Sequence, residues 1–459
     1  MKNSILLLVL IISFSVYGQM PDKLSKAEKV YGLSKFWQEV NYNFIYLNKV
    51  DRKAWEEEYI KLIPEVQESK NDYEYYRLLA KFSAFLKDGH TNIYAYNEIW
   101  EQMNDEFTTH KLLLTGIDGK AIIIGINQSK KDELPLGTEV VKVNGQPTRD
   151  YLKSYVAPYI SSSTDYVLEE LAIRSMFNAP IGSQFEVEFK LPNGSKKKLN
   201  LTISDTKMKE ELFPTVKKKE LLEFKWITRD DIAYVGLNSF TDPAINTLFE
   251  NIMPELYKAK KIIIDLRENG GGNSDIGKDI LEYLTKDTLL HGSRSQSRMH
   301  ISTLKAWGQW TNEADTLNNA EAKRTYLAYR DELYHQFPYN ADTVNLNKKR
   351  IVVPTALLIS MNTASAAEDF LIYADNQEHM IKIGEPSFGS TGQPYHFEMP
   401  GGGFARVCTK KDTYANGKEF VGVGILPDLE VKKSLIDYLE NNDPVLEAAV
   451  KYLEKAVIR

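Results

Sequence analysis

The sequence predicts a mixed α/β protein whose C-terminal half contains a sheet of buried strands connected by helices. Two observations predict this class. Runs rich in Val, Ile and Leu occur at residues 234–237, 261–264, 351–353 and 356–359, and their continuous apolar character is typical of strands covered on both faces. Helical patterns lie among these runs, at residues 243–258 and 274–284. Strands that alternate with helices favour an α/β fold.

The chain of 459 residues is long enough for several domains. Residues 19–108 have helical patterns and predict an N-terminal helical domain, residues 109–205 change to short strands, and a charged linker at 206–224 leads to the α/β part at 225–459. Within that part, residues 290–348 are polar and aromatic. This segment forms either a lid over a cleft or a surface helical insertion.

Residues 1–18 predict a secretory signal peptide. Lys2 precedes an apolar run at residues 5–17, which is shorter than the roughly 20 residues that a membrane-spanning helix needs. We therefore expect an exported protein, periplasmic or secreted, with no integral membrane segment after signal cleavage. An uncleaved N-terminal anchor is the alternative.

Composition excludes several classes of function. With 57 basic and 63 acidic side chains the protein is mildly acidic, so no nucleic-acid partner is expected. Cys408 is the single cysteine, which rules out an intramolecular disulfide and a thiolate metal cluster. The sequence also lacks a His-Glu-x-x-His motif. We expect neither a metal nor another cofactor.

One serine lies where a strand is expected to turn into a helix. Residues 362–368 read Asn-Thr-Ala-Ser-Ala-Ala-Glu, between apolar runs at 355–359 and 370–374. The hydroxyl of Ser365 would lie beside a helix N-terminus, where unpaired backbone N–H groups can stabilise an oxyanion. A serine at such a position is also a common helix N-cap.

Other loops carry residues with possible chemistry. Residues 262–273 form a strand that ends in three glycines, without the spacing of a phosphate-binding loop, and glycines there allow close approach of the backbone to a ligand. Residues 88–91 read Asp-Gly-His-Thr and place His90 after a glycine. Loops rich in glycine and proline follow at 383–394 and 422–428.

In this order, the motifs resemble family S41 of the serine peptidases, which comprises the C-terminal processing or tail-specific proteases and their tricorn-core relatives. The resemblance implies a crotonase/ClpP-like β-spiral catalytic domain at 225–459. Residues 137–147 are similar to the Gly-Asp-x-Ile-x-x-Val-Asn-Gly signature of PDZ domains, so residues 109–205 are expected to form a PDZ-like domain. Such domains capture extended peptides at a sheet edge. A small β-domain without a ligand is the alternative.

One departure from the family pattern indicates which base is used. The processing peptidases have a lysine in a Phe-Gly-Lys-Gly loop, whereas residues 388–391 here read Phe-Gly-Ser-Thr. The tricorn-like branch uses a histidine from the N-terminal part, which His90 resembles. Ser365 is then the nucleophile and His90 the general base, because an imidazole with a pKa near 6.5 can take the hydroxyl proton.

The resemblance also indicates supporting residues. The tricorn-like branch has a glutamate shortly before the closing glycine motif, which points to Glu419, although a solvent-facing strand residue is the alternative. Glu368 is expected to interact with the helix dipole. The oxyanion hole is assigned to the backbone N–H groups of Gly271, by resemblance, and Ala366, which follows the nucleophile.

The sequence therefore predicts an exported serine-type endopeptidase that hydrolyses peptide bonds in proteins or peptides, including bonds near C-termini. A second hypothesis belongs to another class of function. A protein of the same fold can lose its chemistry and hold peptides or apolar ligands without cutting them.

Overall fold

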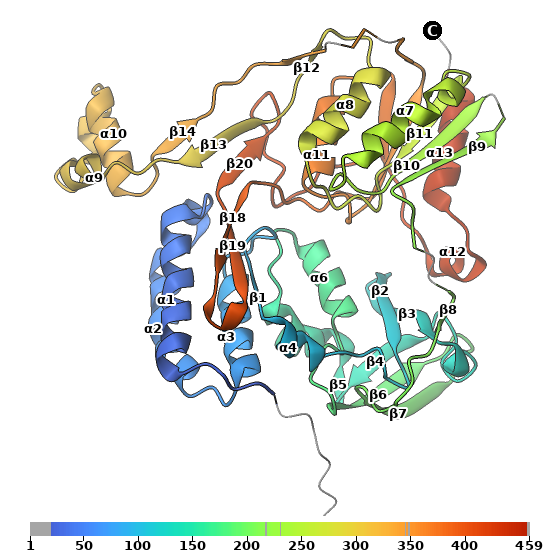
Figure 1. Ribbon diagram of the computed structural model, residues 1–459, viewed down its shortest axis with the longest axis horizontal. Coiled ribbons are helices and arrows are strands. Elements are labelled where there is room, and N and C mark those ends of the chain that lie inside the picture. Colours follow the sequence, from blue (N-terminus) through green and yellow to red (C-terminus); the bar gives the residue numbers. More distant parts are fainter. Residues whose placement is uncertain (1–19, 216–217, 230, 345, 348, 457–459) are drawn as a thin grey trace, which may run out of the picture.

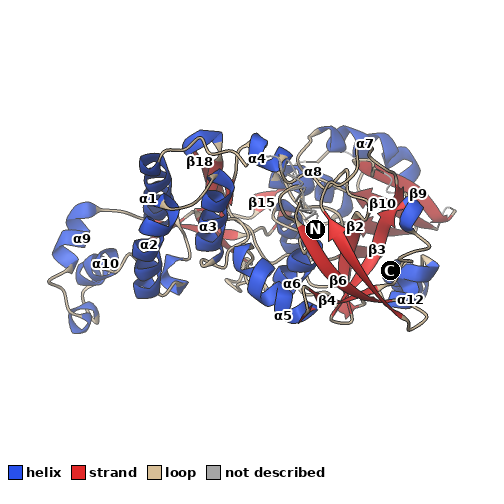
Figure 2. Ribbon diagram, turned by 90° about the horizontal axis from the view of Figure 1, so that it is seen from below, coloured by secondary structure: helices blue, strands red, loops and turns tan. Residues whose placement is uncertain are grey.

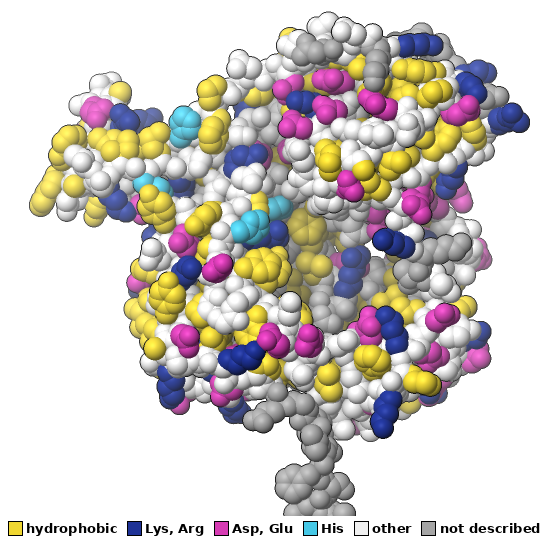
Figure 3. All heavy atoms as spheres, in the orientation of Figure 1, with side chains coloured by type: hydrophobic (Ala, Val, Ile, Leu, Met, Phe, Trp, Pro, Cys, Tyr) yellow, Lys and Arg dark blue, Asp and Glu magenta, His cyan; other side chains and the backbone are white. Residues whose placement is uncertain are grey.

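The computed structural model describes residues 20–215, 218–229, 231–344, 346–347 and 349–456. It consists of an N-terminal helical part, a small β-domain and a larger α/β part (Figure 1). These parts surround a hollow on the face shown in Figure 3. The predicted signal peptide lies outside the described residues. Of the helices in the described ranges, none combines the length and the apolar character that a bilayer crossing requires.

The helical part is built on capped amphipathic helices. The side chains of Ser25, Asp51 and Asn71 accept hydrogen bonds from N–H groups in the first turns of α1, α2 and α3. Trp55 and Phe82 stack in the core with ring centroids 3.8 Å apart. The elements are α1 (Lys26–Asn43), α2 (Arg52–Gln67), α3 (Asp72–Ala84), β1 (Asn92–Tyr94) and α4 (Asn97–Glu101).

The helical part does not form its core alone. β1 pairs with β19 (Phe404–Cys408), which pairs with β18 (Pro394–Glu398), so strands from the C-terminal part complete this region. Met399 and Val407 belong to the same hydrophobic core as the helices. Strand β1 was not predicted. The predicted helical domain at 19–108 shares its core with residues 397–408, while the core of the β-domain is separate and lies beyond residue 108.

The small β-domain follows the predicted strands. Its sheet has the order β2-β3-β4-β6-β7, so β2 lies at an edge, with β5 paired to β4 and β8 to β3. Because β8 lies within the predicted linker, that segment belongs partly to this sheet. Helix α6 was not predicted; it packs beside β2. The elements are β2 (Leu112–Ile117), β3 (Lys120–Asn127), β4 (Glu139–Val143), β5 (Gln146–Pro147), α5 (Thr148–Tyr151), α6 (Asp165–Arg174), β6 (Gln184–Lys190), β7 (Lys196–Thr202) and β8 (Leu212–Phe213).

The α/β part contains a sheet of order β21-β17-β16-β11-β10-β9, in which only β9 is antiparallel to its neighbour. The strands are β9 (Leu222–Thr228), β10 (Ile232–Leu237), β11 (Lys261–Asp265), β16 (Thr355–Ile359), β17 (Met380–Gly384) and β21 (Leu429–Glu430). The predicted strand at 351–353 does not form; Ile351 packs into the core from an extended connection.

Helices cover both faces of this sheet, which explains its continuous apolar strands. Ile262 and Ile264 of β11 pack in the core with α7 (Ala244–Leu256), α8 (Ser274–Leu284) and α11 (Ala366–Ala374), whereas Ile263 packs in the core with α13 (Pro444–Lys455). A short helix, α12 (Leu435–Glu440), precedes α13. The predicted α/β class is therefore confirmed.

The described residues of the segment 290–348 form an extended arm that ends in two helices (Figures 1 and 2). The arm contacts the end of α1, because the Arg298 guanidinium donates to Asn41 O (2.8 Å) and the His300 ring stacks on Tyr42 at 4.1 Å. These contacts favour a surface insertion over a lid. Its elements are β12 (Leu289–Leu290), β13 (Arg294–Arg298), α9 (Ser302–Gly308), α10 (Ala320–Tyr329), β14 (Tyr334–Gln336) and β15 (Asp342–Thr343), and β13 also pairs with β20 (Lys410–Thr413).

Candidate active site

Ser365 lies on a tight turn between β16 and α11, as predicted. Its backbone has φ 55° and ψ −121°, a positive φ that costs a non-glycine residue on the order of 1–3 kcal/mol. The turn is held in place by the segment that follows β11, because Thr363 Oγ1 donates to Leu266 O (2.9 Å) and Ala364 N–H donates to Asn269 O (3.0 Å). Ser365 and Glu368 together have the arrangement of a capping box, in which the Ser365 side chain faces the Glu368 N–H in the first turn of α11. A serine on a strained turn between a strand and a helix is typical of a nucleophile, and it also fits the N-cap alternative.

Glu368 fixes this turn from inside the protein. One carboxylate oxygen, Oε2, accepts the N–H of Ser365 at 3.0 Å. The other, Oε1, accepts the Ser387 hydroxyl at 2.5 Å and the Gly389 N–H at 2.8 Å. Glu368 is fully buried, and burial raises its pKa to about 8 although these donors favour the charged form. The side chain therefore links the nucleophile turn to the loop at residues 387–390, a role beyond the predicted dipole interaction.

His90 reaches the same loop from the helical part. Its Nδ1 lies 2.7 Å from Ser390 Oγ, and Ser390 is fully buried while His90 is 8% exposed. The preceding residue is fixed on two sides, because Gly89 N–H donates to Ser163 Oγ (3.0 Å) and Gly89 O accepts from Arg406 Nη2 (3.1 Å). Burial, followed by the charge of Arg406, lowers the pKa of His90 to about 4. The imidazole is therefore neutral at pH 7, with a pKa well below the reference value used in the sequence prediction.

The loop at residues 387–390 connects the two predicted catalytic residues. Phe388 N–H donates to Thr363 O (2.9 Å) in the nucleophile turn, and two residues later Ser390 contacts His90. No direct hydrogen bond joins Ser365 to His90 within the part of the chain that the structure describes. Ser390 occupies the position where the processing peptidases have lysine. Sequence reasoning noted the missing lysine but did not assign a role to the serine that replaces it.

The glycine turn packs directly against Ser365. Gly271 has φ +97°, and a Cβ added there would lie 2.7 Å from Ser365 Cβ and 2.9 Å from the Ala366 nitrogen. Only glycine fits this position. The Gly271 N–H, however, donates to Asn269 Oδ1 at 2.9 Å, so in this structure it is not available to an oxyanion as predicted. The Ala366 N–H has no acceptor among the described residues, and its role in an oxyanion hole stays a prediction.

Glu419 lies in a different environment from the one predicted for it. Its carboxylate pairs with Lys49 at 3.1 Å and with Lys411, and its side chain is 46% exposed. The hydrogen bond from Lys411 is the main cause that lowers its pKa. No hydrogen bond connects Glu419 to His90 or Ser390 in the described ranges. These contacts are those of a surface ion pair, and they do not support the predicted orienting role.

The site also contains a second buried carboxylate next to the histidine. Asp88 Oδ2 accepts the Thr91 hydroxyl at 2.6 Å, and burial raises the pKa of Asp88 to about 6. Asp88 therefore stabilises the turn that carries His90 and does not contact the imidazole. Among the residues that the structure describes, no cluster of three or more His, Cys, Asp or Glu side chains could hold a metal ion.

Comparison with known proteins identifies the family. Residues 231–431 match the family model described as peptidase family S41. The structure resembles mature CPAF complexed with lactacystin, with a TM-score of 0.66 and 13% identity over 94% of this chain and 99% of that chain. Mature CPAF alone gives a TM-score of 0.66 and 14% identity over 94% of this chain and 96% of that chain. At such identities the likeness concerns the fold. No curated protein matches the sequence.

The family match extends over the strands from β10 to β21 and includes both the glycine turn and the turn of Ser365. This membership favours an enzyme over the alternative of a binding protein without chemistry. The segment 231–431 therefore belongs to peptidase family S41, which makes this protein a serine peptidase.

Proposed function

We propose that this peptidase cuts peptide bonds with Ser365 as the nucleophile and His90 as the general base. The observation that carries the proposal is the loop at residues 387–390, which is hydrogen-bonded to the nucleophile turn at one end and to the imidazole at the other. A neutral imidazole can accept a proton at physiological pH, and burial keeps His90 neutral. The serine hydroxyl alone would be a poor nucleophile.

Ser390 determines which nitrogen of His90 acts. If Nδ1–H donates to Ser390 Oγ, the lone pair of Nε2 is free to receive the proton of Ser365. The Ser365 oxygen then forms a bond to the carbonyl carbon of the substrate. The imidazolium returns its proton to the amine nitrogen as the carbon–nitrogen bond breaks, and water hydrolyses the acyl-enzyme by the same route. Ser390 is thus a positioning residue, and it provides a neutral hydroxyl in place of a carboxylate.

The oxyanion formed in this step lies at the N-terminus of α11 in our proposal. The Ala366 N–H is the first donor, since it belongs to the residue after the nucleophile and has no acceptor in the described chain. Gly271 becomes the second donor if its N–H exchanges Asn269 Oδ1 for the substrate oxygen. Because Gly271 packs directly against Ser365, this exchange of acceptors involves only the glycine turn.

We further propose that the enzyme is exported through its N-terminal signal peptide, is periplasmic or secreted, and hydrolyses peptide bonds in proteins or peptides, including bonds near C-termini. We assign a crotonase-like core to the α/β part and a PDZ-like role to the β-domain, because β2 is an edge strand beside α6. Glu170 of α6 accepts the Gly116 N–H and the Thr115 hydroxyl of that strand, both at 2.7 Å. A peptide that adds to β2 must therefore displace this carboxylate.

Covalent labelling tests the assignment of the nucleophile. A fluorophosphonate probe should add one phosphonyl group to the wild-type protein, and peptide mapping should place it on Ser365. Ser365→Ala should fold normally, lose the label and lose hydrolysis of casein by a factor on the order of 10⁴ to 10⁶. Ser195→Ala, in an exposed turn of the β-domain, is the matched control and should keep both. Normal hydrolysis by folded Ser365→Ala would refute the proposal.

A further inference from the structure

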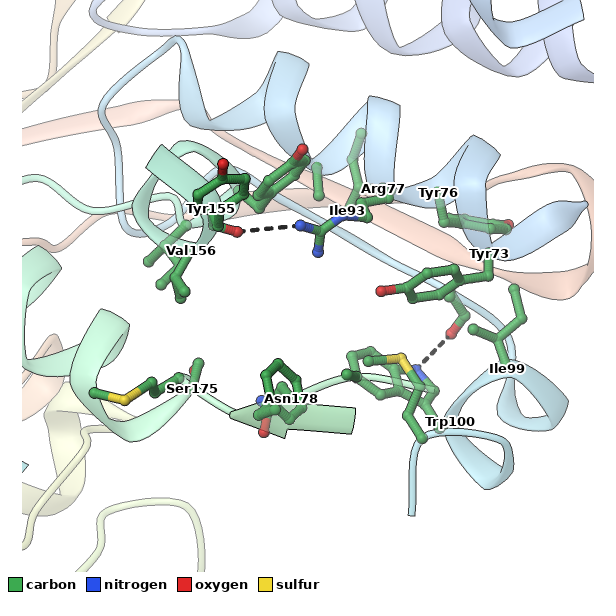
Figure 4. A pocket seen from close by; sticks show the side chains of 18 of the residues that line it. Tyr73, Tyr76, Arg77, Ile93, Ile99, Trp100, Tyr155, Val156, Ser175 and Asn178 are labelled. Carbon is green, nitrogen blue, oxygen red and sulfur yellow. Dashed lines mark hydrogen bonds between the residues drawn. The ribbon is translucent and has the colours of Figure 1, made fainter. Parts of the chain in front are cut away.

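Two of the pockets that border the helical part differ in charge. The pocket in Figure 4 lies between this part and the β-domain, and Arg77 is the only charged residue among the described residues that line it. That guanidinium already has partners, because it donates to Tyr155 O at 3.1 Å and lies 3.6 Å from the centroid of the Tyr159 ring. The other pocket lies between the helical part and the arm, and its cations have fewer partners.

The pocket at the arm has a volume of about 490 Å³, which is in the range of small-ligand sites. Trp37 and Tyr42 line it from α1, and Arg52 lines it from the start of α2. The arm contributes Lys305 of α9 and Asp331, which follows α10. Asp331 is the only acidic residue among the described residues that line the pocket, and none of the proposed catalytic residues lines it.

Three cations share the single carboxylate of Asp331. Lys305 Nζ lies 2.6 Å from Oδ1, whereas Arg298 Nη2 lies 3.7 Å from the same oxygen and Arg52 Nη1 lies 3.6 Å from Oδ2. Only the lysine is therefore within hydrogen-bond distance. The Arg52 side chain makes no hydrogen bond in the part of the chain that the structure describes. Since a guanidinium has five donors in a planar fork, Arg52 retains capacity for a further anion.

Arg298 adds a buried positive charge next to this pocket. Its side chain is 2% exposed, and Nη1 donates to Asn41 O at 2.8 Å and to Tyr42 O at 3.1 Å. Its Nε and Nη2 groups have no hydrogen-bond acceptor among the described residues, although buried donors are normally paired. Burial, followed by the charge of Arg298, lowers the pKa of His300, which lines the same pocket. The positive charge here thus exceeds what Asp331 neutralises.

We infer that this pocket binds a phosphate group and that the bound group holds the arm against the helical part. The phosphate oxygens accept hydrogen bonds from Arg52 of the helical part and from Lys305 of the arm, while Arg298 contributes charge from the interior. Arginine binds phosphate through two parallel N–H···O bonds, and a phosphate carries more negative charge than one carboxylate. The pocket also has room for an organic group beside the phosphate, next to the rings of Trp37 and Tyr42.

Calorimetry on the full chain at constant ionic strength tests the binding. Inorganic phosphate should bind at least tenfold more tightly than acetate. Arg52→Gln should weaken phosphate binding about tenfold, since a charge-assisted hydrogen bond contributes about 1.5 kcal/mol. Lys53→Gln removes the neighbouring cation of α2, which is 87% exposed, and as the matched control it should leave the affinity unchanged. Asp331→Asn should tighten binding about fivefold, because it removes a like charge close to the anion.

A comparison of ligands identifies the source of the phosphate group. Phenyl phosphate that binds more tightly than inorganic phosphate would indicate an organic phosphate ester, and equal affinities would indicate the free ion. Both results support the site. Amide hydrogen exchange tests whether the ligand holds the arm. At a phosphate concentration ten times the dissociation constant, exchange in α9 should slow about tenfold in the wild type and much less in Arg52→Gln.

Three outcomes would overturn the inference. Equal affinity for phosphate and acetate would do so without any variant. Normal phosphate binding by folded Arg52→Gln would place the anion elsewhere, and if that variant fails to fold, normal binding by Lys305→Gln would lead to the same conclusion. Unchanged exchange in α9 at saturating phosphate would show that the ligand does not hold the arm. None of these measurements depends on Ser365 chemistry, so their failure leaves the proposed function standing.

Discussion

The proposed nucleophile and the proposed general base of this peptidase are held by two differently constructed regions. The Ser365 turn is continuous with β16 and α11 and is fixed by neighbours from its own sheet. His90 follows a helix of another part of the molecule, and its position depends on contacts with Ser163, Ser390 and Arg406. The first arrangement is local and strained, whereas the second is assembled from distant segments. Productive geometry between them therefore depends on the loop at residues 387–390, which contacts both.

This difference has an electrostatic counterpart. Glu368, on the nucleophile side, is a buried carboxyl group whose pKa is raised to about 8. His90, on the other side, is a buried imidazole whose pKa is lowered to about 4. In both groups burial is the largest cause of the pKa shift, and in both it favours the neutral form. At pH 7 the site thus holds an uncharged base and a mostly uncharged acid.

The largest expected effect comes from removing the histidine. His90→Ala should lower kcat/KM by a factor on the order of 10⁴ to 10⁶, close to the loss in Ser365→Ala, because the nucleophile cannot lose its proton. The double variant should be little worse than either single one, since the pair acts as a unit. Hydrolysis of a fluorogenic peptide measures all three. If His90→Ala retained most activity while a lysine variant lost it, a different base would be in use.

Glu368→Gln tests the nucleophile side and should act mainly through stability. The carboxyl oxygens accept three donors. The protonated acid carries one hydrogen there, whereas an amide carries two, so at least one amide N–H faces another donor group. An unsatisfied buried donor costs about 1–3 kcal/mol, measurable by urea unfolding. Asp428→Asn, which changes a more exposed carboxylate, serves as the control. Equal stability of wild type and Glu368→Gln would show that these hydrogen bonds of Glu368 do not stabilise the fold.

The same carboxyl group predicts a pH dependence of the free energy of unfolding. Its pKa is raised from 4.5 to about 8 on folding, so the folded state binds the proton more tightly. The resulting stabilisation is complete below pH 4.5 and is lost as the pH rises through 8. Urea titrations of wild type between pH 5 and 8 should therefore show a decline in stability that Glu368→Gln reduces. Parallel curves for the two proteins would contradict the raised pKa.

Ser390→Ala should have a smaller effect, on the histidine side. The imidazole loses the partner that fixes its tautomer, and a net hydrogen bond of about 1.4 kcal/mol corresponds to about tenfold in kcat. KM should stay unchanged, because Ser390 is fully buried behind the base. Ser161→Ala is the matched control, since that hydroxyl contacts Ser83 and not His90. A rise in KM with normal kcat would indicate a role in substrate binding instead.

The smallest effect is expected at Glu419. A half-exposed ion pair contributes little to stability, so Glu419→Gln should change the free energy of unfolding by less than about 0.5 kcal/mol and leave kcat/KM unaltered. Thermal unfolding and peptide hydrolysis measure the two quantities. A tenfold loss of kcat with normal stability would return the orienting role to this residue.

The surroundings of Ser365, which are close to it in the sequence, were predicted better than the surroundings of His90, which come from distant segments. The strand, turn and helix around Ser365 follow from a continuous pattern of apolar and small residues, and α8 has the predicted bounds. Ser390 could not be assigned, because its partner lies 300 positions away and nothing in the local pattern indicates the pairing. Glu419 was chosen by resemblance, but Lys49 and Lys411 lie beside it in the fold. Strand β1 likewise forms only because β19 is its partner.

The central claim is that a neutral His90, held by Ser390, activates Ser365. The pH dependence of the rate at which a fluorophosphonate labels Ser365 tests it most directly, because no substrate binding or product release intervenes. With the pKa of His90 lowered to about 4, the rate should be nearly constant from pH 6 to 8, decline with a midpoint near 4, and be lost in His90→Ala. A midpoint at 6.5 or above, or normal labelling of folded His90→Ala, would contradict the claim.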